Sequence, residues 1–327
     1  MTYRSLLQGA AFAALIGGAA PLLSAIPAQA ETVSVREQLP ASFRFTLGKI
    51  EITALSDGTV PSDLHKLLLN TNEGAIDAHL QAAFQANPTE ASINAFLIQD
   101  GDRRILVDTG AGELFGPGFG GKLVTALGAV GVAPAQITDI LITHIHTDHT
   151  GGLVSGGAMV FPNATLHVGK PDLDFFLDAA NAKKTGYAQQ YFDEAAKTMG
   201  PYVKAGHVKA FAAEETVLPG IVASVHPGHT PGSAFYKLTS DGQSILFVGD
   251  IVHSLPVQMP EPSVAIVYDV DPKGAVATRE AAFTAFARDR QLIAAPHLPF
   301  PGVGHVTASG KEQFSWVPLL YRNRASQ

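Results

Sequence analysis

From Phe43 onward, hydrophobic residues gather in short runs that predict β-strands. Each run is apolar throughout or alternates with polar residues, and each is bounded by Gly, Asp or Pro, which is typical of strands in a buried sheet. The predicted strands are Phe43–Leu47, Ile50–Leu55, Ala95–Gln99, Arg104–Val107, Asp139–Ile142, Thr165–Val168, Ile221–Val225, Ala234–Leu238, Ile245–Val248 and Leu292–Ala294.

Helices are expected between several of these strands. The predicted helices are Ile76–Ala86, Lys122–Ala129, Pro171–Ala180, Gln190–Met199 and Lys273–Asp289, the last opened by Asp271-Pro272. The mixture indicates an α/β fold, and the hairpin-like neighbours Ala95–Gln99 and Arg104–Val107 speak against a purely parallel sheet. Because no fixed-period repeat and no long linker interrupts the chain, we expect residues 31–327 to form a single domain.

The first thirty residues differ from the rest. Arg4 is their only charged residue, an apolar stretch covers Leu6–Ile26, and Ala28-Gln29-Ala30 offers the small residues that a signal peptidase recognises. We predict that Met1–Ala30 is a cleaved secretory signal and that the protein is periplasmic or secreted. The alternative is an uncleaved anchor, since the apolar stretch is nearly the roughly 20 residues that span a bilayer; Gly17, Gly18 and Pro21 favour cleavage and no stable membrane anchor.

Composition narrows the chemistry. Without Arg4, 21 basic residues face 29 acidic ones, a formal net charge of −8, so a polyanion would be repelled and a nucleic-acid partner is not expected. The chain has no cysteine, so it has no disulfide, and nitrogen and oxygen atoms must hold any metal ion.

Polar residues follow directly after predicted strands at Asp108, His144, Asp250 and His297. Strand ends are where α/β enzymes place their sites, because the sheet fixes the backbone while the loop beyond it stays exposed. The strongest signal is the segment 144–152, HIHTDHTGG, which holds three histidines and an aspartate within six positions. A single histidine in such a loop would be interpreted as an ordinary surface residue. Three histidines and an aspartate within six positions indicate metal ligands.

Local spacing suggests how these ligands are shared. In an extended segment, residues two apart point the same way, so His144 and His146 can bind one ion together. Asp148 and His149 precede Gly151-Gly152, where a turn would present them to a second ion. Imidazole and carboxylate suit Zn, Mn, Fe or Co.

The segment His144-Ile145-His146-Thr147-Asp148-His149 resembles the H-x-H-x-D-H motif of the metallo-β-lactamase superfamily. The resemblance implies a four-layer αβ/βα sandwich with two mixed sheets flanked by helices, and two divalent metal ions, with zinc expected. It adds His229, Asp250 and His297 as ligands, with Asp250 between the ions, and it makes Asp57 and Asp108 structural turn residues. The implied metal set is His144, His146, Asp148, His149, His229, Asp250 and His297, and the implied catalytic residues are Asp250 and Asp148.

Two metal ions of this kind share a bridging hydroxide that attacks an ester, lactone, amide or phosphoester. The chain contains no G-x-S-x-G elbow and no H-E-x-x-H helix, so competing hydrolase designs lack support.

Longer stretches resemble the methyl parathion hydrolase branch of the superfamily, among them 51–60 (EITALSDGTV), 114–117 (LFGP) and 300–306 (FPGVGHV). This resemblance implies an exported homodimer that hydrolyses neutral organophosphate triesters, with lactone or aryl ester hydrolysis as the alternative native activity. It implies a substrate pocket formed by Phe115, Phe176, Tyr191, Phe192 and His253, although aromatic residues at helical spacing also suit core packing.

Three departures from the branch are visible. Phe176 replaces an expected Trp, His253 an expected apolar residue, and Ser233 an expected His. A histidine at the pocket mouth puts efficient triester turnover in doubt more than metal binding. Two further alternatives remain: a binding or scaffold protein that has lost catalysis, and a β-lactamase.

Overall fold

The computed structural model describes residues 38–324, so the predicted signal Met1–Ala30 lies outside the described residues. Two seven-stranded sheets form the centre of the part from Leu39 onward. The first sheet contains β1 (Ser42–Leu47), β2 (Ile50–Ser62), β4 (Thr89–Asp100), β5 (Arg103–Val107), β6 (Asp139–Ile142), β9 (Thr165–Gly169) and β10 (Val208–Phe211), in this order. Its pairs are antiparallel up to β5 and parallel from β5 to β10.

The second sheet is almost wholly antiparallel. It contains β11 (Glu215–Leu218), β12 (Ile221–Val225), β13 (Ala234–Ser240), β14 (Gln243–Phe247), β16 (Leu292–Ala294), β17 (Val303–Gly310) and β18 (Gln313–Pro318), in this order. Only β14 and β16 pair in parallel, and the longest described helix, α9 (Pro272–Asp289), connects them. Both sheets are therefore mixed.

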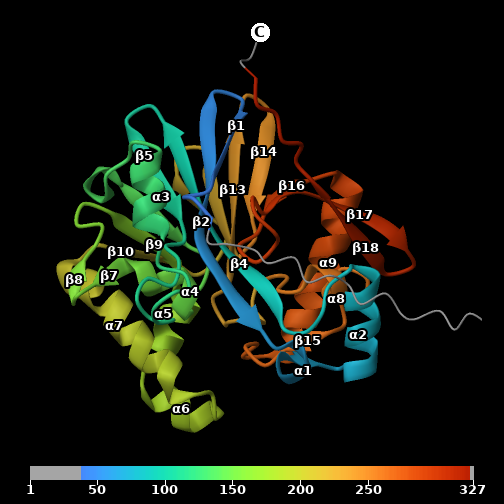
Figure 1. Ribbon diagram of the computed structural model, residues 1–327. Helices are drawn as coiled ribbons and strands as arrows, with labels where there is room; N and C mark the ends of the chain where they lie inside the picture. The colour runs from blue at the N-terminus through green and yellow to red at the C-terminus, as the bar shows by residue number, and fades with distance from the viewer. Residues whose placement is uncertain (1–37, 325–327) are drawn as a thin grey trace, which may run out of the picture. The chain divides into compact units, whose positions relative to one another are not determined.

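Helices cover the outer face of each sheet (Figure 1). On the first sheet these are α3 (Leu123–Ala129), α5 (Lys170–Phe176) and α7 (Gln189–Ala205), whose buried side chains join one core with those of the strands. On the second sheet α9 packs through Phe283 and Phe286. A third core fills the space between the sheets, and this arrangement confirms the predicted four-layer sandwich.

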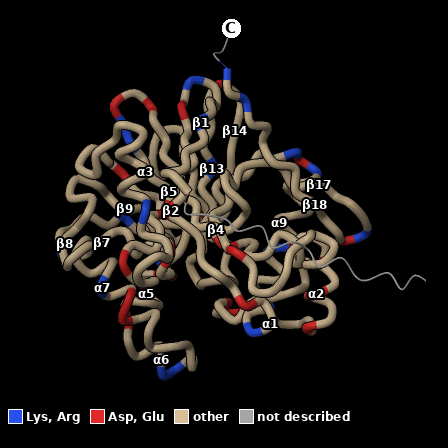
Figure 2. Tube along the Cα trace, viewed as in Figure 1, with Lys and Arg blue, Asp and Glu red and all other residues tan. Residues whose placement is uncertain are grey.

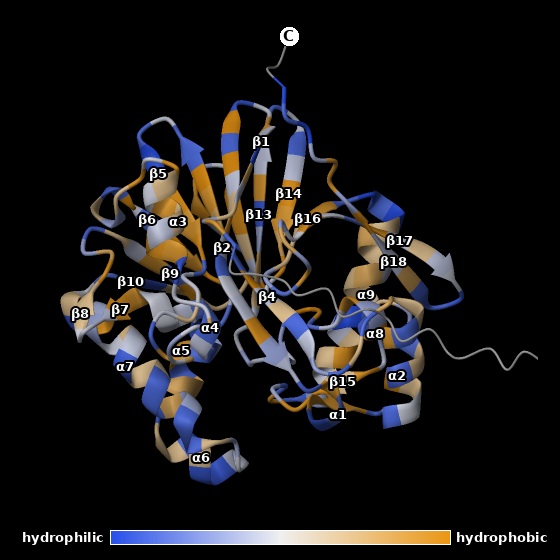
Figure 3. Cartoon of the chain, viewed as in Figure 1, coloured by the Kyte–Doolittle hydropathy of each residue, from blue (hydrophilic) through white to orange (hydrophobic). Residues whose placement is uncertain are grey.

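Strand β4 shows how one strand serves two cores. Ala95 and Leu97 belong to the core under the helices, whereas Phe96 and Ile98 point to the second sheet. Because successive side chains of a strand point to opposite faces and both faces are covered, the strand is hydrophobic throughout. The same holds for β6, whose Ile140 and Ile142 join the first of these cores and whose Leu141 joins the second. Figure 3 shows orange, hydrophobic segments in the strands beside α3.

Smaller elements border the sandwich. Two short antiparallel pairs are β3 (Leu68–Leu69) with β15 (Ala265–Ile266), and β7 (Val154–Ser155) with β8 (Ala158–Met159). The remaining helices are α1 (Leu64–Leu67), α2 (Glu73–Ala82), α4 (Thr147–Thr150), α6 (Ala180–Thr185) and α8 (Leu255–Gln258). Over residues 38–324, no helix has the length and apolar character needed to traverse a lipid bilayer.

The ten predicted strands and five predicted helices are all present. Strands β6, β12 and β16 have the predicted bounds, and the other elements have shifted ends. Helix α2 begins after the Asn72 cap, whose side chain accepts a hydrogen bond from the Ala75 amide, and it ends before Phe84, which has a positive φ of 57°. Helix α5 stops at Phe176, short of the predicted Ala180. Strands β10, β11, β17 and β18 were not predicted, because their exposed positions leave no continuous apolar run.

Candidate metal centre

All of the predicted ligands meet at one edge of the sandwich, beyond the carboxyl ends of four strands. His144 and α4, with Asp148 and His149, follow β6 of the first sheet. His229, Asp250 and His297 follow β12, β14 and β16 of the second. The site therefore lies where loops from both sheets converge.

The local conformation after β6 differs from the extended one that spacing suggested. The strand ends at Ile142, His146 is the residue that caps α4 with an extended backbone, and Asp148 and His149 lie within the helix itself. The rings of His144 and His146 are edge to face at a centroid distance of 4.7 Å. A short helical turn thus brings four side chains of one segment to the site.

The first group of candidate ligands is His144, His146, His229 and Asp250, all buried. His146 Nδ1 lies 3.1 Å from both His144 Nε2 and His229 Nε2. Asp250 Oδ2 lies 3.5 Å from His144 Nε2 and 3.3 Å from His229 Nε2. Atoms that surround a zinc ion tetrahedrally at about 2.0–2.1 Å are about 3.3 Å apart, so these spacings fit one such ion.

The second group is Asp148, His149 and His297, completed by Asp250. Asp148 Oδ1 lies 3.7 Å from His149 Nε2, and Asp148 Oδ2 lies 3.3 Å from His297 Nε2. Asp250 Oδ1 is 3.2 Å from His149 Nε2, and its Oδ2 is 3.1 Å from His297 Nε2. Asp250 therefore faces both groups, as expected for a carboxylate between two ions.

Each of these histidines is held through its other ring nitrogen. The partners are Thr143 Oγ1 for His144 Nδ1 (3.2 Å), Tyr187 Oη for His146 Nε2 (2.9 Å), Asp108 Oδ2 for His149 Nδ1 (2.8 Å), Asp269 Oδ1 for His229 Nδ1 (2.8 Å) and the Ser92 carbonyl for His297 Nδ1 (2.8 Å). This pattern is characteristic of metal-binding histidines, because the outer hydrogen bond selects the tautomer that turns a lone pair toward the ion.

Electrostatics also favour a cation here. Burial alone would raise the pKa of Asp250, but the surrounding imidazoles, His149 first, hold it well below its usual range. Burial opposes charge on His229, yet its bonds to Asp250 and Asp269 raise its pKa to about 9. A buried carboxylate that stays ionised among imidazoles suits divalent ions bound by nitrogen and oxygen ligands.

Two further aspartates fix the loops around the ligands. Asp108, which has a positive φ of 57°, accepts hydrogen bonds from the Thr143 amide and hydroxyl as well as from His149. Asp57 is fully buried and accepts from the amides of Ala111, Gly121 and Leu123. Both have the structural role near the site that the resemblance implied.

A cavity of about 420 Å³ opens above the candidate ligands. His146, Asp148, Asp250, His253 and His297 form its polar end. Its walls are largely apolar and include Val60, Pro61, Leu64, Leu114, Phe115 and Ile266, together with Tyr191 and Tyr268. In the part of the chain that the structure describes, no lysine or arginine lines this cavity.

The predicted pocket residues separate into two sets. Phe115, Tyr191 and His253 line the cavity. Phe176 and Phe192 instead lie in the core between α5, α7 and the first sheet, with 1% and 2% exposure, which corrects their predicted place. Helical spacing points these two rings inward, so they support the cavity wall from behind; Phe176 still contacts the ring of His146 at 5.6 Å.

His253 differs from the five histidines above. Its Nε2 lies 3.0 Å from Asp250 Oδ2, and its ring stacks on His297 at 5.2 Å. With Asp250 and His297 it forms a third group of metal-compatible atoms, but its buried Nδ1 has no hydrogen-bond partner among residues 38–324. Because its ring lacks, among these described residues, the outer hydrogen-bond partner that holds each of the five candidate histidine ligands, His253 resembles a substrate-facing side chain more than a ligand.

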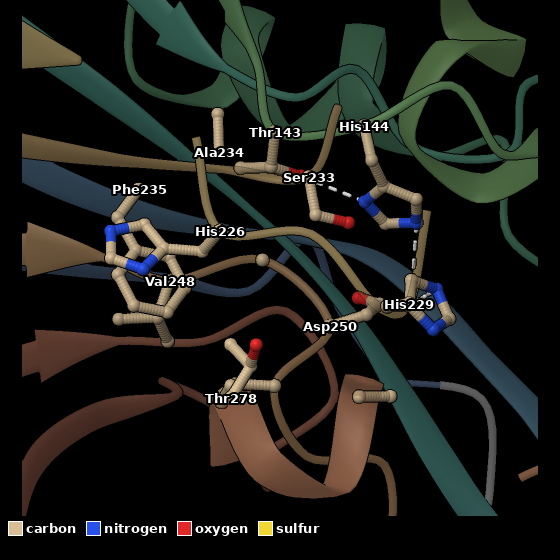
Figure 4. Close-up of a pocket in the computed structure, with 13 residues that line it drawn as sticks. Thr143, His144, His226, His229, Ser233, Ala234, Phe235, Val248, Asp250 and Thr278 are labelled. Atoms are coloured by element: carbon tan, nitrogen blue, oxygen red, sulfur yellow. Dashed lines mark hydrogen bonds and ion pairs between the residues drawn. The ribbon is translucent and has the colours of Figure 1, made fainter. Parts of the chain in front are cut away.

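Figure 4 shows the rear of the cluster, where His144, His229, Ser233 and Asp250 face a void of about 10 Å³. This volume is about that of one water molecule. In Figure 2, Lys and Arg are dispersed over outer loops and helix ends and do not form a continuous basic stripe in that view.

Sequence reasoning missed Tyr187, Tyr268 and Asp269, which lie far from the motif and contact it only in the folded chain. Tyr187 Oη donates to the Tyr268 carbonyl at 2.8 Å, and Asp269 holds His229. Asp269 could have drawn attention as a buried acid before α9, but no spacing rule links it to His229.

Comparisons with known proteins agree with this geometry. A sequence model of the metallo-beta-lactamase superfamily matches residues 88–297. The crystal structure of hydrolase AbOPH, in the beta lactamase superfamily, is 36% identical with a TM-score of 0.83, covering 88% of this chain and 100% of that one. The structure of AidC, a dizinc quorum-quenching lactonase in complex with a product, is 26% identical with a TM-score of 0.79, covering 88% and 100%.

Curated relatives match over shorter stretches. Ribonuclease TTHA0252 of Thermus thermophilus is 25% identical over 190 residues, which are 55% of this chain and 40% of that protein. The chain spans about two fifths of the length of the curated relatives it matches.

Proposed function

This chain belongs to the metallo-beta-lactamase superfamily, and from that premise we propose that it is a dinuclear metal-dependent hydrolase of small neutral esters, chiefly lactones and aryl esters. One observation supports this substrate class above others. The cavity over the His/Asp cluster has apolar and aromatic walls and no lysine or arginine among its described lining. Such a cavity suits an uncharged substrate with an apolar group and offers no cationic partner for an anionic one.

Divalent ions in the two ligand groups would act as Lewis acids that polarise the carbonyl or phosphoryl oxygen and make water nucleophilic near neutral pH. The protein's own contribution is positioning. Asp250 and Asp148 are the proposed catalytic residues: Asp250 is held between the groups by imidazoles on both sides. Asp148 is more exposed, with 15% of its side chain accessible, and its carboxylate can accept a proton from the attacking water.

The cavity walls supply orientation and exclude water. The rings of Tyr191 and Tyr268 lie beside the polar end, 5.1 Å from His146 and 6.2 Å from His253, and Phe115 adds an apolar ring to the lining. His253 adds a polar imidazole to the cavity lining, with its Nε2 bonded to Asp250. A hydrogen-bonding group at that place favours lactones and esters over triesters with bulky apolar substituents.

The similarity to AidC, a lactonase, supports the same choice. Neutral organophosphate triesters are the second candidate, because stretches such as 51–60 and 300–306 resemble the methyl parathion hydrolase branch and the largely apolar cavity walls would admit them.

The test is a substrate panel with metal-reconstituted protein. N-acyl-homoserine lactones, an aryl acetate, an aryl phosphotriester and a penicillin are assayed in parallel, with metal-depleted protein as control. We expect metal-dependent turnover, highest for a lactone or aryl ester and absent for the penicillin. Triester turnover above that of every lactone and ester would reverse the order of the two candidates, and stable metal binding without turnover of any substrate would favour a binding protein.

Metal content is a separate proposal. We expect about two bound divalent ions per chain, zinc in the first place, with Mn, Co and Fe also compatible with the ligands. Elemental analysis after purification tests this, and fewer than one ion per chain would contradict it.

Export and assembly also belong to this proposal. A signal peptide at Met1–Ala30 and a periplasmic or secreted location predict a mature protein that starts at Glu31, which mass spectrometry of the exported form would detect. The homodimer expected from the resemblance predicts twice the chain mass in solution, measurable by light scattering.

A further inference from the structure

His146 differs from the other four candidate histidine ligands in the origin of its anchor. The groups that hold His144, His149, His229 and His297 belong to strands and loops at the edge of the two sheets. His146 is held by Tyr187, which lies in the short link between α6 and α7. One ligand of the first group thus depends on the helical layer outside the first sheet.

The direction of the hydrogen bonds at Tyr187 is determined by chemistry. Its hydroxyl lies 2.8 Å from the Tyr268 carbonyl, and a carbonyl oxygen can only accept. The single phenol proton is therefore donated to Tyr268, and Tyr187 Oη must accept from His146 Nε2, 2.9 Å away. His146 then carries its proton on Nε2 and has a lone pair on Nδ1.

That lone pair faces the place where an ion would bind. His146 Nδ1 is the atom 3.1 Å from both His144 Nε2 and His229 Nε2. If the proton moved to Nδ1, it would lie among these nitrogens and block coordination. The bond to Tyr187 thus favours the one neutral form of His146 that can bind a metal.

Aromatic packing holds Tyr187 in place. Its ring stacks on Tyr191 at 4.8 Å and meets Phe176 and Phe192, which belong to the core under α5 and α7. This gives Phe176 and Phe192 an indirect part in the site.

The hydrogen bonds from His146 to Tyr187 and from Tyr187 to Tyr268 also lead to His229, another member of the first ligand group. Tyr268 directly precedes Asp269, which accepts from His229 Nδ1 at 2.8 Å. His146 and His229 are therefore tied to the same two-residue segment, one through Tyr187 and one directly.

We propose that Tyr187 is a positioning residue that sets the tautomer of His146 and thereby the metal affinity of the group His144, His146, His229 and Asp250. The affinity part rests on the proposed metal-dependent function, whereas the tautomer part concerns the protein without metal.

The first experiment reads the tautomer directly. In metal-free protein labelled with ¹⁵N-histidine, long-range ¹H–¹⁵N spectra distinguish an Nε2–H from an Nδ1–H imidazole. We expect His146 to be Nε2-protonated in wild type and to lose this preference in Tyr187→Phe. The matched control is Tyr202→Phe, which also removes a buried hydroxyl that donates to a backbone carbonyl, that of Leu153, but contacts no candidate ligand.

The second experiment measures zinc affinity by competition with a chromogenic chelator. Removing the outer partner of a metal-binding histidine weakens binding 10–100-fold, so Tyr187→Phe should lose about that factor at one of two sites while Tyr202→Phe keeps both affinities. Urea unfolding of the metal-free variants verifies that both remain folded. If folded Tyr187→Phe kept both the His146 tautomer and the zinc affinity of wild type, the proposal would be overturned. If wild type itself did not bind zinc, the proposed metal-dependent function would be refuted, and the tautomer measurement alone would decide the role of Tyr187.

Discussion

At residue scale, Gly152 allows two loops of the site to touch. A Cβ atom at this position would lie 1.9 Å from the Thr109 carbonyl oxygen, which is backbone and cannot move aside. The same contact brings the Thr109 amide and hydroxyl to the His149 carbonyl, each at 2.8 Å. The absence of a side chain at Gly152 is thus required for α4 to rest on the Asp108 loop.

Gly152→Ala should therefore destabilise the protein by about 2 kcal/mol or more, in the range of overpacking substitutions, and should also lower metal content. The control is Gly128→Ala in α3, where nothing lies within 4 Å of the new methyl group. At this helical position alanine should raise the free energy of unfolding by about 0.5–1 kcal/mol. Urea unfolding of both variants is the measurement. Equal stability of the two would mean that the close approach does not exist.

Asp172, a buried residue of α5, joins two ligand loops. Its carboxylate accepts from the Ile145 amide and the Thr230 hydroxyl, both at 2.9 Å, and from the Gly232 amide. In Asp172→Asn the amide group can no longer accept at one of these oxygens. We expect a loss of about 1–3 kcal/mol at pH 7, typical of a buried group left without its partner.

The same variant should respond differently to pH. Burial raises the pKa of Asp172 to about 6, from 3.8, although its hydrogen bonds oppose this. Between pH 6 and 4 the folded wild type thus binds a proton on this carboxyl that the unfolded chain does not bind. The free energy of unfolding of wild type therefore rises as pH falls through 6, and this gain is lost as pH rises through 6. The difference in free energy of unfolding between metal-free wild type and metal-free Asp172→Asn should therefore be larger at pH 5 than at pH 7. The same difference at both pH values, measured by urea titration, would contradict the raised pKa.

At the scale of elements, α9 fixes the loop that follows Asp250. Arg279, with 1% exposure, donates to the carbonyls of Ile251, Pro262 and Val264. These residues bracket His253 and lead to Ile266 at the cavity wall. A guanidinium bound by three carbonyls in the interior therefore shapes one side of the cavity.

Arg279→Met should leave the carbonyls of Ile251 and Pro262 without a donor, while Val264 keeps its bond from the Gln258 side chain. We expect a destabilisation of at least about 2 kcal/mol, because each unsatisfied buried group costs about 1–3 kcal/mol. Arg288→Met on the same helix is the control, since Arg288 is exposed and pairs only with Asp289; its effect should stay within about 0.5 kcal/mol. Thermal and urea unfolding test both. A mild effect of Arg279→Met would show that water replaces the guanidinium.

Elements with apolar runs were predictable from sequence, and those without were not. Strands β4 and β6 are buried on both faces, so hydrophobic residues mark them in the sequence. Strand β17 is half exposed and gives no such signal. The ends of α2 and α5 depend on a cap and on tertiary packing, which composition does not reveal.

The site shows the same division. The dense segment 144–149 and the residues after strand ends indicated the ligand cluster, and the structure brings all seven together. Tyr187 and Asp269 were invisible because their contacts with His146 and His229 cross long stretches of chain. Phe176 and Phe192 were misplaced because helical spacing does not tell a cavity wall from the core behind it.

At the scale of the whole molecule, removal of metal should lower stability. A ligand that binds only the folded state at about 100 times its Kd adds about 2.7 kcal/mol. Chelation should therefore lower the unfolding midpoint, and zinc should restore it. The double variant His146→Ala, His297→Ala should show little response to either treatment, and an equal response to chelation in this variant would locate the stabilising ion elsewhere.

The two ligand groups draw on both sheets, since His144, His146, Asp148 and His149 follow β6 while His229, Asp250 and His297 follow strands of the second sheet. Ions held there would cross-link the halves of the sandwich, joining chain segments more than a hundred positions apart. In a protein without a single cysteine, this centre would take the place that disulfide bridges hold in other domains, with a strength that depends on the supply of metal rather than on the redox state of the surroundings.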